Sequence, residues 1–469
     1  MKIYYSMLPR LFRKYIFFIV VLFGLLMSVS TKAQLSTAQE VANQLKIGWN
    51  LGNTLEAICG ENAWGAGITT QTLIDSVKAA GFNTVRVPCA WDCHTINGVI
   101  DPVWIVRVKK IIDYCINDNM YVILNIHWDG GWLENHVTIS DQTSVNAKQL
   151  NYWTQIATYF KDYDEHLLFA GANEPNVTDA TGMSVLLSYH QTFINAVRAT
   201  GGNNSSRTLI IQGPSTDIDR TNTLMNTMPT DQIADRLIVE VHYYTPWNFC
   251  GMNADESWGK MFYYWGKGNH STTDVTRNAT WGEESDMDKS LSLMKTKFID
   301  KGIPVIIGEY GAFRRVLSPP SNQALHNASI EYYYRYFMKS ATEKGFKTFC
   351  WDTPGWMFNR STNAILDRST VNAIMQGAND ATTGNVILKE NSIKVYPNPF
   401  TSTFNIKVEN PDYIDRISVF DMMGRQVETV EHSAIKNSLA IGSSLKPEMY
   451  VVQVYGTEWT KSFKVLKRE

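Results

Sequence analysis

The sequence has few charged residues and lacks the ligand spacings of a catalytic metal site. Charged residues make up only 19% of the 469 residues. The nine histidines form no H-E-x-x-H motif, and the six cysteines include no C-x-x-C pair. These absences argue against a metal hydrolase, and we expect no metal and no cofactor in the mechanism. A structural Ca²⁺ ion stays an open alternative.

The chain also lacks the positive charge that binding to nucleic acid requires. Its formal net charge is −2, and residues 1–33 carry five cations and no acidic residue, so removal of this segment moves the charge from −2 to −7. We therefore expect no nucleic-acid partner. Aromatic residues are plentiful instead, at 12% with 14 Trp, which suits core packing and a cleft that stacks flat, uncharged rings such as sugars.

Residues 1–33 are typical of a secretory signal peptide. Basic residues precede an apolar run over Tyr15–Val29, and small and polar residues follow as far as Ala33. The run is shorter than the roughly 20 residues of a membrane-spanning helix, and no cysteine follows it for a lipid anchor. We expect cleavage near Ala33, export and no permanent membrane span. The alternative is an uncleaved N-terminal anchor.

Disulfides can persist in an exported chain. Cys115 lies in a helical pattern and Cys350 in an apolar strand, so we expect both to be buried thiols. Cys59, Cys93 and Cys250 fall in or near predicted loops, which allows a Cys59–Cys93 bridge. The sequence does not define the pairing.

Short β-rich runs alternate with longer amphipathic runs from residue 45 to about 375, the pattern of repeated βα units. The predicted strands are 45–50, 83–88, 121–127, 167–173, 208–213, 237–243, 303–309 and 346–351. The predicted helices are 70–80, 102–119, 146–163, 183–200, 287–301 and 323–344. Eight strands in this order predict an α/β fold, a closed (β/α)₈ TIM barrel over residues 34–378. The alternative, an open doubly wound sheet, would need a G-x-G-x-x-G turn that does not follow the first strand.

The residue pattern of the sequence changes after residue 378. Residues 379–391 are polar and without a helical pattern, so we interpret them as a linker. Residues 392–469 contain short alternating runs separated by turn residues, which predicts a small all-β sandwich. The predicted strands are 404–408, 417–420, 427–430, 450–454 and 463–466.

Ionisable and aromatic side chains gather where the predicted barrel strands end, which is where catalytic groups of such barrels lie. They are Arg86, His127, Glu174, His242, Glu309 and Trp351. Each has an ordinary explanation alone, since an arginine can pair a carboxylate and a histidine or tryptophan can pack in the core. Six at one rim favour a functional site.

Glu174 and Glu309 provide the two carboxyl groups that glycoside hydrolysis uses. One carboxyl protonates the leaving oxygen, and the other attacks the anomeric carbon. A separation of roughly 5–5.5 Å would imply retention of configuration. We expect the ionised neighbour to raise the pKa of the acid and Arg86 to keep the nucleophile charged.

Residues 45–377 resemble the family 5 glycoside hydrolases, the cellulase family, through motifs that occur in order at the strand ends. They are Gly48–Thr54, Ala63–Gly65, Val85–Pro88, Trp91–His94, Leu124–His127, Asn173–Pro175, His242–Pro246 and Ile307–Gly311. The resemblance implies that Glu174 is the acid/base and Glu309 the nucleophile. It also implies that Asn173 binds the sugar 2-hydroxyl and that Arg86 and Tyr244 position and polarise the nucleophile.

The resemblance implies binding roles for other side chains at the same rim. His127 and His242 would contact the sugar or the acid, and Trp351 would stack beneath the sugar. The glycone side of the cleft would be lined by His94, Trp64 and Asn53. The alternatives are structural roles for His127 and His242 and core packing for Trp64 and Trp351.

Other carboxylates compete with the pair. Glu240 has the same strand parity as His242, so we expect it to point into the barrel one layer below the rim and interpret it as a buried support residue. Four acids on predicted loops could bind sugar hydroxyls: Asp92, Asp129, Glu134 and Asp352.

The C-terminal region resembles the sorting domain of bacterial type IX secretion substrates. The matching segments are Val395–Phe400, Val419–Arg425, Met449–Val452 and the basic end Lys461–Arg468. The resemblance implies secretion or display on the cell surface, with the bacterial secretion machinery as partner. The alternative is a carbohydrate-binding module, for which Trp459 and a few tyrosines would supply the sugar platform.

Together these features predict a monomeric, secreted endo-β-1,4-glucanase that acts on a β-glucan polysaccharide. A β-mannanase or xyloglucanase is open, because the same residues can cleave each polymer. A non-catalytic glycan-binding protein is the alternative from another class, and retention of both glutamates argues against it.

Overall fold

The structure is a computed structural model that describes residues 35–319, 321–390, 393–408, 411, 414–456 and 459–469. The expected signal peptide, residues 1–33, lies outside the described residues. Among the described helices, none is both long and apolar enough to cross a membrane.

Eight parallel strands close into a barrel in the order β1-β10-β9-β8-β7-β6-β5-β2. They are β1 (Ile47–Asn50), β2 (Thr84–Val87), β5 (Tyr121–Asn125), β6 (Leu167–Ala170), β7 (Leu209–Gln212), β8 (Leu237–Tyr243), β9 (Val305–Tyr310) and β10 (Lys347–Cys350). The predicted (β/α)₈ barrel is confirmed, because β1 pairs in parallel with both β2 and β10 and leaves no edge. A small hairpin, β3 (Thr95–Ile96) and β4 (Val99–Ile100), follows β2.

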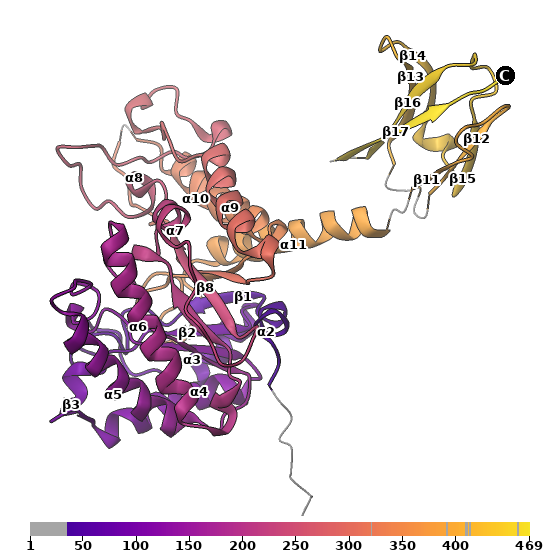
Figure 1. The fold of residues 1–469 in the computed structure, drawn as a ribbon. Coiled ribbons are helices and arrows are strands. Elements are labelled where there is room, and N and C mark those ends of the chain that lie inside the picture. Colours follow the sequence, from indigo (N-terminus) through magenta and orange to yellow (C-terminus); the bar gives the residue numbers. More distant parts are fainter. Residues whose placement is uncertain (1–34, 320, 391–392, 409–410, 412–413, 457–458) are drawn as a thin grey trace, which may run out of the picture.

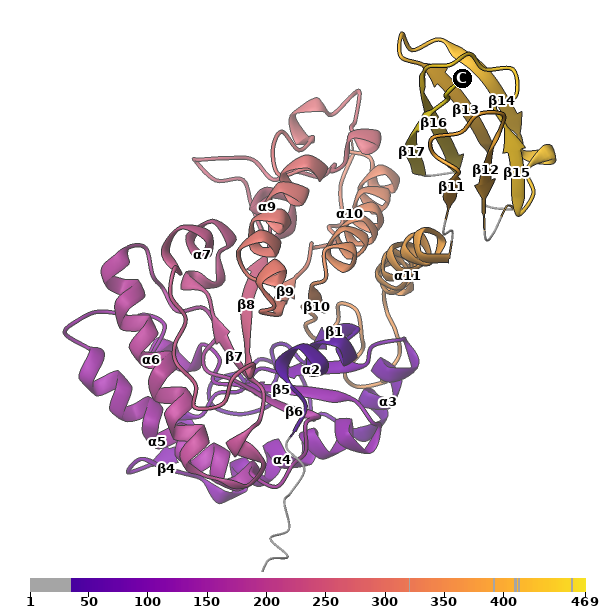
Figure 2. The same cartoon turned by 45° about the vertical axis from the view of Figure 1, so that its right-hand side comes forward.

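Helices surround the barrel strands (Figures 1 and 2). They are α3 (Gln71–Ala79), α4 (Pro102–Asn117), α5 (Gln142–Phe160), α6 (Ala180–Ala199), α7 (Ile218–Leu224), α8 (Trp247–Cys250), α9 (Glu284–Lys297), α10 (Gln323–Glu343) and α11 (Arg368–Glu390). Local hydrogen bonds and proline positions determine where these helices begin. Asp101, for example, accepts the amide of Val103 and is followed by a proline, whose missing N–H costs nothing in a first turn.

The short helix α2 (Ala38–Gln44) packs its apolar face against side chains inside the barrel. Val41 and Leu45 share a cluster with Ile123, Ile238 and Ile306, which come from three different strands. Tyr121, at the start of β5, belongs to the same cluster. The helix therefore fills the end where the strands begin, and the opposite rim is left for the functional groups.

The expected non-helical linker over residues 379–391 is wrong, because α11 continues to Glu390. Val371, Ile374 and Ala381 are buried on one face of this helix, with a spacing of three and seven residues. Asp380 accepts a hydrogen bond of 2.7 Å from Arg335 of α10. The buried face of α11 continues with small alanines and packs along α10. Alanines give no clear apolar pattern in the sequence, so the helix was not predicted there.

The last part of the chain forms two antiparallel sheets, as expected for a small sandwich (Figure 1). One sheet has β11 (Lys394–Tyr396), β12 (Phe404–Lys407) and β15 (Ser438–Ile441). The other has β14 (Gln426–Glu431), β13 (Arg416–Asp421), β16 (Met449–Gly456) and β17 (Trp459–Leu466). Ile406, Ile417 and Val452 lie in the core that the two sheets share. The short strands β11 and β15 were not among the predicted runs.

Cys59 and Cys93 form the disulfide that the sequence allowed. It joins the loop after β1 to the turn after β2, and both loops border the open rim of the barrel. Cys115 and Cys350 are buried free thiols, as predicted, and Cys250 is also buried and free.

Candidate active site

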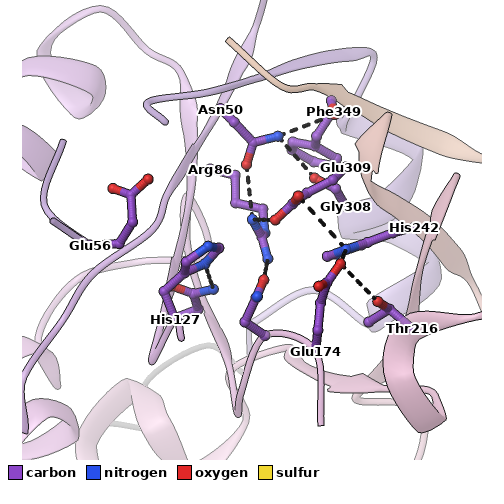
Figure 3. Close-up of polar contacts among 12 residues, drawn as sticks. Asn50, Glu56, Arg86, His127, Glu174, Thr216, His242, Gly308, Glu309 and Phe349 are labelled. Carbon is purple, nitrogen blue, oxygen red and sulfur yellow. Dashed lines mark hydrogen bonds and ion pairs between the residues drawn. The ribbon is translucent and has the colours of Figure 1, made fainter. Parts of the chain in front are cut away.

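A buried guanidinium organises the open rim of the barrel (Figure 3). Arg86 of β2 has no exposed surface. One of its terminal nitrogens donates to Glu309 Oε1 at 2.9 Å and to Asn50 Oδ1 at 3.0 Å. The other donates to Asn173 Oδ1 at 2.9 Å, and its Nε lies 3.0 Å from Glu240 Oε1. One side chain thus links groups from β1, β8, β9 and the segment after β6.

Glu309 of β9 is fixed at both carboxylate oxygens. Arg86 binds Oε1, and the Tyr244 hydroxyl donates to Oε2 at 3.0 Å. The side chain of Glu309 is only 8% exposed, whereas that of Glu174 is 43% exposed. A rigid, buried carboxylate therefore faces one that is open to solvent.

The two glutamates lie within reach of one sugar. An oxygen of Glu174, an oxygen of Glu309 and a ring nitrogen of His242 are all within 4.8 Å of one another. This spacing is close to the separation of about 5–5.5 Å in retaining glycosidases and below the roughly 6.5–9.5 Å of inverting ones. The barrel thus brings together two residues that the sequence separates widely.

His242 carries a positive charge between three carboxylates. Its Nδ1 lies 2.7 Å from Glu174 Oε1 and 3.8 Å from Glu309 Oε2, and its Nε2 lies 3.3 Å from Glu240 Oε1. Burial alone would lower the pKa of His242, but these carboxylates raise it to about 10. The imidazolium is therefore the stable form at neutral pH.

The charge of His242 also decides whether Glu174, His242 and Glu309 could bind a metal ion. Two carboxylates and an imidazole at this spacing could hold a cation geometrically. A metal ligand, however, needs a neutral ring nitrogen with a free lone pair. Both ring nitrogens of His242 face carboxylate oxygens as donors, so these residues fit a proton better than a metal.

The expected rise in the pKa of Glu174 is wrong for the free site. Partial burial of the carboxyl raises the pKa, but His242 and Arg86 outweigh burial and lower it. For Glu309, burial raises the pKa, and the charge of Glu174 adds to this effect against His242 and Arg86. The direct contact of His242 with Glu174 explains the difference, and sequence alone could not show that contact.

His127 lies beside the pair as a neutral ring. Asn125 accepts the amide of Cys89 with its Oδ1, so its Nδ2 donates to His127 Nδ1 at 3.2 Å. Burial and the nearby charges of Arg86 and His242 lower the pKa of His127 well below its ordinary value. Its Nε2 therefore carries the proton as a hydrogen-bond donor. The ring stacks on Trp351 with centroids 5.7 Å apart.

The residues expected on the glycone side have different surroundings. Trp64 is 47% exposed, which argues against the core-packing alternative. His94 stacks on Trp104 at 3.6 Å and its Nε2 has no hydrogen-bond partner in the described residues. The backbone N–H of Asn53 donates to Glu56, a buried acid that the sequence patterns did not single out. Burial raises the pKa of Glu56 to about 7.

Three of the four loop acids are buried and engaged within the protein. Asp352 accepts from Trp49 Nε1 at 3.1 Å and pairs with Arg360. Asp129 accepts the amide of Asp92 at 3.0 Å and Trp132 Nε1 at 2.9 Å. Glu134, the third, is 7% exposed. The carboxylate oxygens of Asp352 and Asp129 already hold loops in place, which argues against the alternative that these two acids bind sugar hydroxyls.

The remaining loop acid, Asp92, is partly exposed and is also engaged. Its carboxylate accepts from the Tyr152 hydroxyl at 2.5 Å and pairs with Lys148. Asp92 therefore holds the loop after β2 in place and does not contact Glu174 or Glu309.

Glu240 lies beneath the pair, as the sequence indicated. Its carboxylate is fully buried against Arg86 and His242, and it accepts from Gln212 Nε2 at 2.6 Å. A Cβ at position 308 would lie 1.8 Å from Glu240 Oε1. Gly308 therefore allows this carboxylate to reach Arg86 directly under Glu309.

We predict that Glu240→Gln lowers the pKa of His242 from about 10 by at least about one unit, because one of its carboxylate partners loses its charge. Titration of the imidazole by NMR measures the shift. The Asp92→Asn variant, which alters a carboxyl outside this group, is the control. An unchanged His242 pKa in Glu240→Gln would contradict the assigned charge balance.

Comparisons with known proteins give two matches along the chain. Residues 42–355 match the family model of cellulase (glycosyl hydrolase family 5), and residues 394–468 match that of the secretion system C-terminal sorting domain. Endoglucanase A of Paenibacillus barcinonensis is 33% identical over 390 residues, which cover 74% of this chain and 93% of that protein. A xyloglucan-specific endo-β-1,4-glucanase of Bacteroides ovatus is 35% identical over 73% of this chain and 70% of that protein.

Solved structures give the same picture for the barrel. A family 5 xyloglucan-specific β-1,4-glucanase from a ruminal metagenomic library, in complex with XXLG, is 42% identical with a TM-score of 0.68. The match covers 74% of this chain and 97% of that chain. A broad-specificity endoglucanase from Ruminococcus champanellensis, with bound cellotriose, is 33% identical with a TM-score of 0.63 and covers 74% and 100% of the two chains.

Proposed function

The chain belongs to glycosyl hydrolase family 5, and from this membership and the geometry of the site we propose that it hydrolyses β-1,4-glucan by double displacement. Glu309 is the nucleophile and Glu174 the acid/base. The observation that carries the proposal is the approach of the two carboxylates to within 4.8 Å, with Glu309 fixed by Arg86 and Tyr244.

In the first step, Glu309 forms a bond to the anomeric carbon while the bond to the leaving oxygen breaks and Glu174 protonates that oxygen. In the second step, Glu174 takes a proton from water, and the oxygen of that water replaces Glu309 at the anomeric carbon. Two inversions give net retention.

The surroundings of the two carboxyls support these roles rather than the reverse. A nucleophile benefits from a fixed position, and both oxygens of Glu309 are held. An acid must reach the leaving group, and Glu174 is the exposed member. The proton it needs lies next to it in the free site, on His242 Nδ1 at 2.7 Å from Glu174 Oε1. Transfer along this hydrogen bond, once a sugar displaces water from Glu174, makes Glu174 the acid.

Exposed aromatic side chains next to the site support a polymer substrate. Trp128 follows His127 and is 42% exposed. Trp247 is 47% exposed and makes an edge contact with Tyr244, the partner of Glu309. Indole faces bind sugar rings, so platforms beside an open acid suit internal cleavage of a chain. Two relatives are named as xyloglucan-specific, which makes xyloglucan the β-1,4-glucan we propose first.

The sorting domain indicates secretion or attachment at the cell surface. We further propose that residues 1–33 are a cleaved signal peptide and that the enzyme is a monomer. An N-terminal sequence of the exported protein that does not begin near residue 34 would contradict the first point, and a dimer by light scattering the second.

For the catalytic pair, Glu309→Ala should lower kcat on glucan by at least about 10⁴-fold, because no covalent intermediate can form. Azide should restore part of the activity and give a product of inverted configuration. Glu174→Ala is the matched variant, and it should keep more activity on aryl cellobiosides with good leaving groups than on glucan. Near-normal activity of Glu309→Ala on every β-glycan would refute the roles.

For the substrate, the purified full chain should cleave xyloglucan and carboxymethylcellulose with a kcat/KM at least about tenfold above that on mannan, since a difference of about 1.4 kcal/mol is expected from one or two sugar contacts. Reducing-end release on xyloglucan, carboxymethylcellulose, lichenan and mannan measures it. A clear preference for mannan would make the enzyme a β-mannanase instead.

A further inference from the structure

We propose that Glu134 is a positioning residue that holds the backbone around Glu174 in place and whose negative charge helps Glu174 hold a proton once a sugar is bound. This inference rests on the proposed role of Glu174 as acid/base. Glu134 thus acts as a buried partner of the reaction and not as a loop acid that binds sugar.

Glu134 binds both sides of the catalytic acid. Its Oε1 accepts the backbone N–H of Glu174 at 2.7 Å. Its own carbonyl oxygen accepts the N–H of Asn176 at 2.9 Å. Pro175, between them, has no N–H to offer. A single residue therefore holds the two backbone donors that flank Pro175, and with them the direction in which the Glu174 side chain leaves the chain.

Asn173, the residue before Glu174, is held by Arg86. Arg86 donates to Asn173 Oδ1 at 2.9 Å, so the NH₂ group of this amide points away from Arg86. The Asn173 side chain lowers the pKa of Glu134, against the effect of burial, by stabilising the charge of that carboxyl. Arg86 and Glu134 therefore both act on the segment that carries Glu174.

The loop around Glu134 places this carboxyl below the surface. The loop follows β5 and begins with a tight turn at Gly130 and Gly131, both at a φ of 76°. Asp129 anchors its start through Trp132, and the amide of Asn135 donates to the carbonyl of Gly131 at 3.1 Å. Glu134 is 7% exposed. It is thus held against the segment of Glu174.

The negative charge of Glu134 affects the pKa of Glu174. Burial raises the pKa of Glu134 to about 7, against the hydrogen bonds from Glu174 and Asn173, and the charges of Glu174 and Glu309 add to the rise. Repulsion is mutual, so an ionised Glu134 raises the pKa of Glu174. The other groups facing Glu174 are His242 and Arg86, which lower its pKa, and Glu240 and Glu309, whose negative charges raise it.

The decisive variant is Glu134→Gln in the full chain, assayed from pH 4 to 10 on xyloglucan and on an aryl cellobioside with a good leaving group. Loss of the charge lowers the pKa that Glu174 has with a sugar bound, so the alkaline limb of kcat on xyloglucan, which reports the enzyme–substrate complex, should move to lower pH by at least about half a unit. We expect kcat on xyloglucan to fall about tenfold or more with little change in KM. The aryl substrate should lose less, because its leaving group needs no proton.

Two further variants separate this role from a merely structural one. Asp129→Asn alters another buried carboxyl of the same loop, which touches neither Asn173 nor Glu174, and should leave the alkaline limb in place. Glu134→Asp keeps the charge and should restore the limb. If Glu134→Gln does not fold, Glu134→Asp still tests positioning, since its shorter side chain should reduce kcat on xyloglucan more than on the aryl substrate.

An unchanged alkaline limb in Glu134→Gln, or equal losses on both substrates, would overturn the role of Glu134. Failure of the underlying function looks different. If Glu174→Ala itself loses equal activity on both substrates, then Glu174 is not the acid, whatever the result at position 134.

Discussion

The site depends on one buried cation. Arg86 has no exposed surface, and a buried charge without partners would cost several kcal/mol. Its partners are Glu309, Glu240, Asn50 and Asn173, which come from different parts of the barrel. Arg86 is therefore stable in the core only when the strands have closed around it, and the same contacts place Glu309, the proposed nucleophile. Folding and assembly of the site are thus a single event.

The balance of charges explains how His242 and Glu174 can exchange a proton. Glu174, Glu240 and Glu309 face the cations Arg86 and His242. With all five ionised, three negative charges meet two positive ones, so one carboxylate is left without a full counter-charge. The ring of His242 touches both the exposed acid and the buried support. A small rearrangement can then move the proton between His242 and Glu174 without creating an unpaired charge in the core.

The sequence predicts the frame of this site well. Alternating apolar runs give all eight strands, and the polar residues at their ends meet at one rim because a closed parallel barrel leaves no other place for them. Loops were less accessible to prediction. An acid such as Asp352 is surrounded by Trp49 and Arg360, which are distant in sequence, so its burial follows only from tertiary contacts. The same holds for Glu56 and for the contact that lowers the pKa of Glu174.

In the proposed double displacement, Glu309 becomes covalently attached to the sugar. A 2-deoxy-2-fluoro cellobioside with a good leaving group slows the second step more than the first and so traps the intermediate. After incubation and proteolysis, mass spectrometry should find the added disaccharide on the peptide that contains Glu309, at one equivalent per chain. A label on a different residue, or hydrolysis with inversion and no label, would contradict the double displacement.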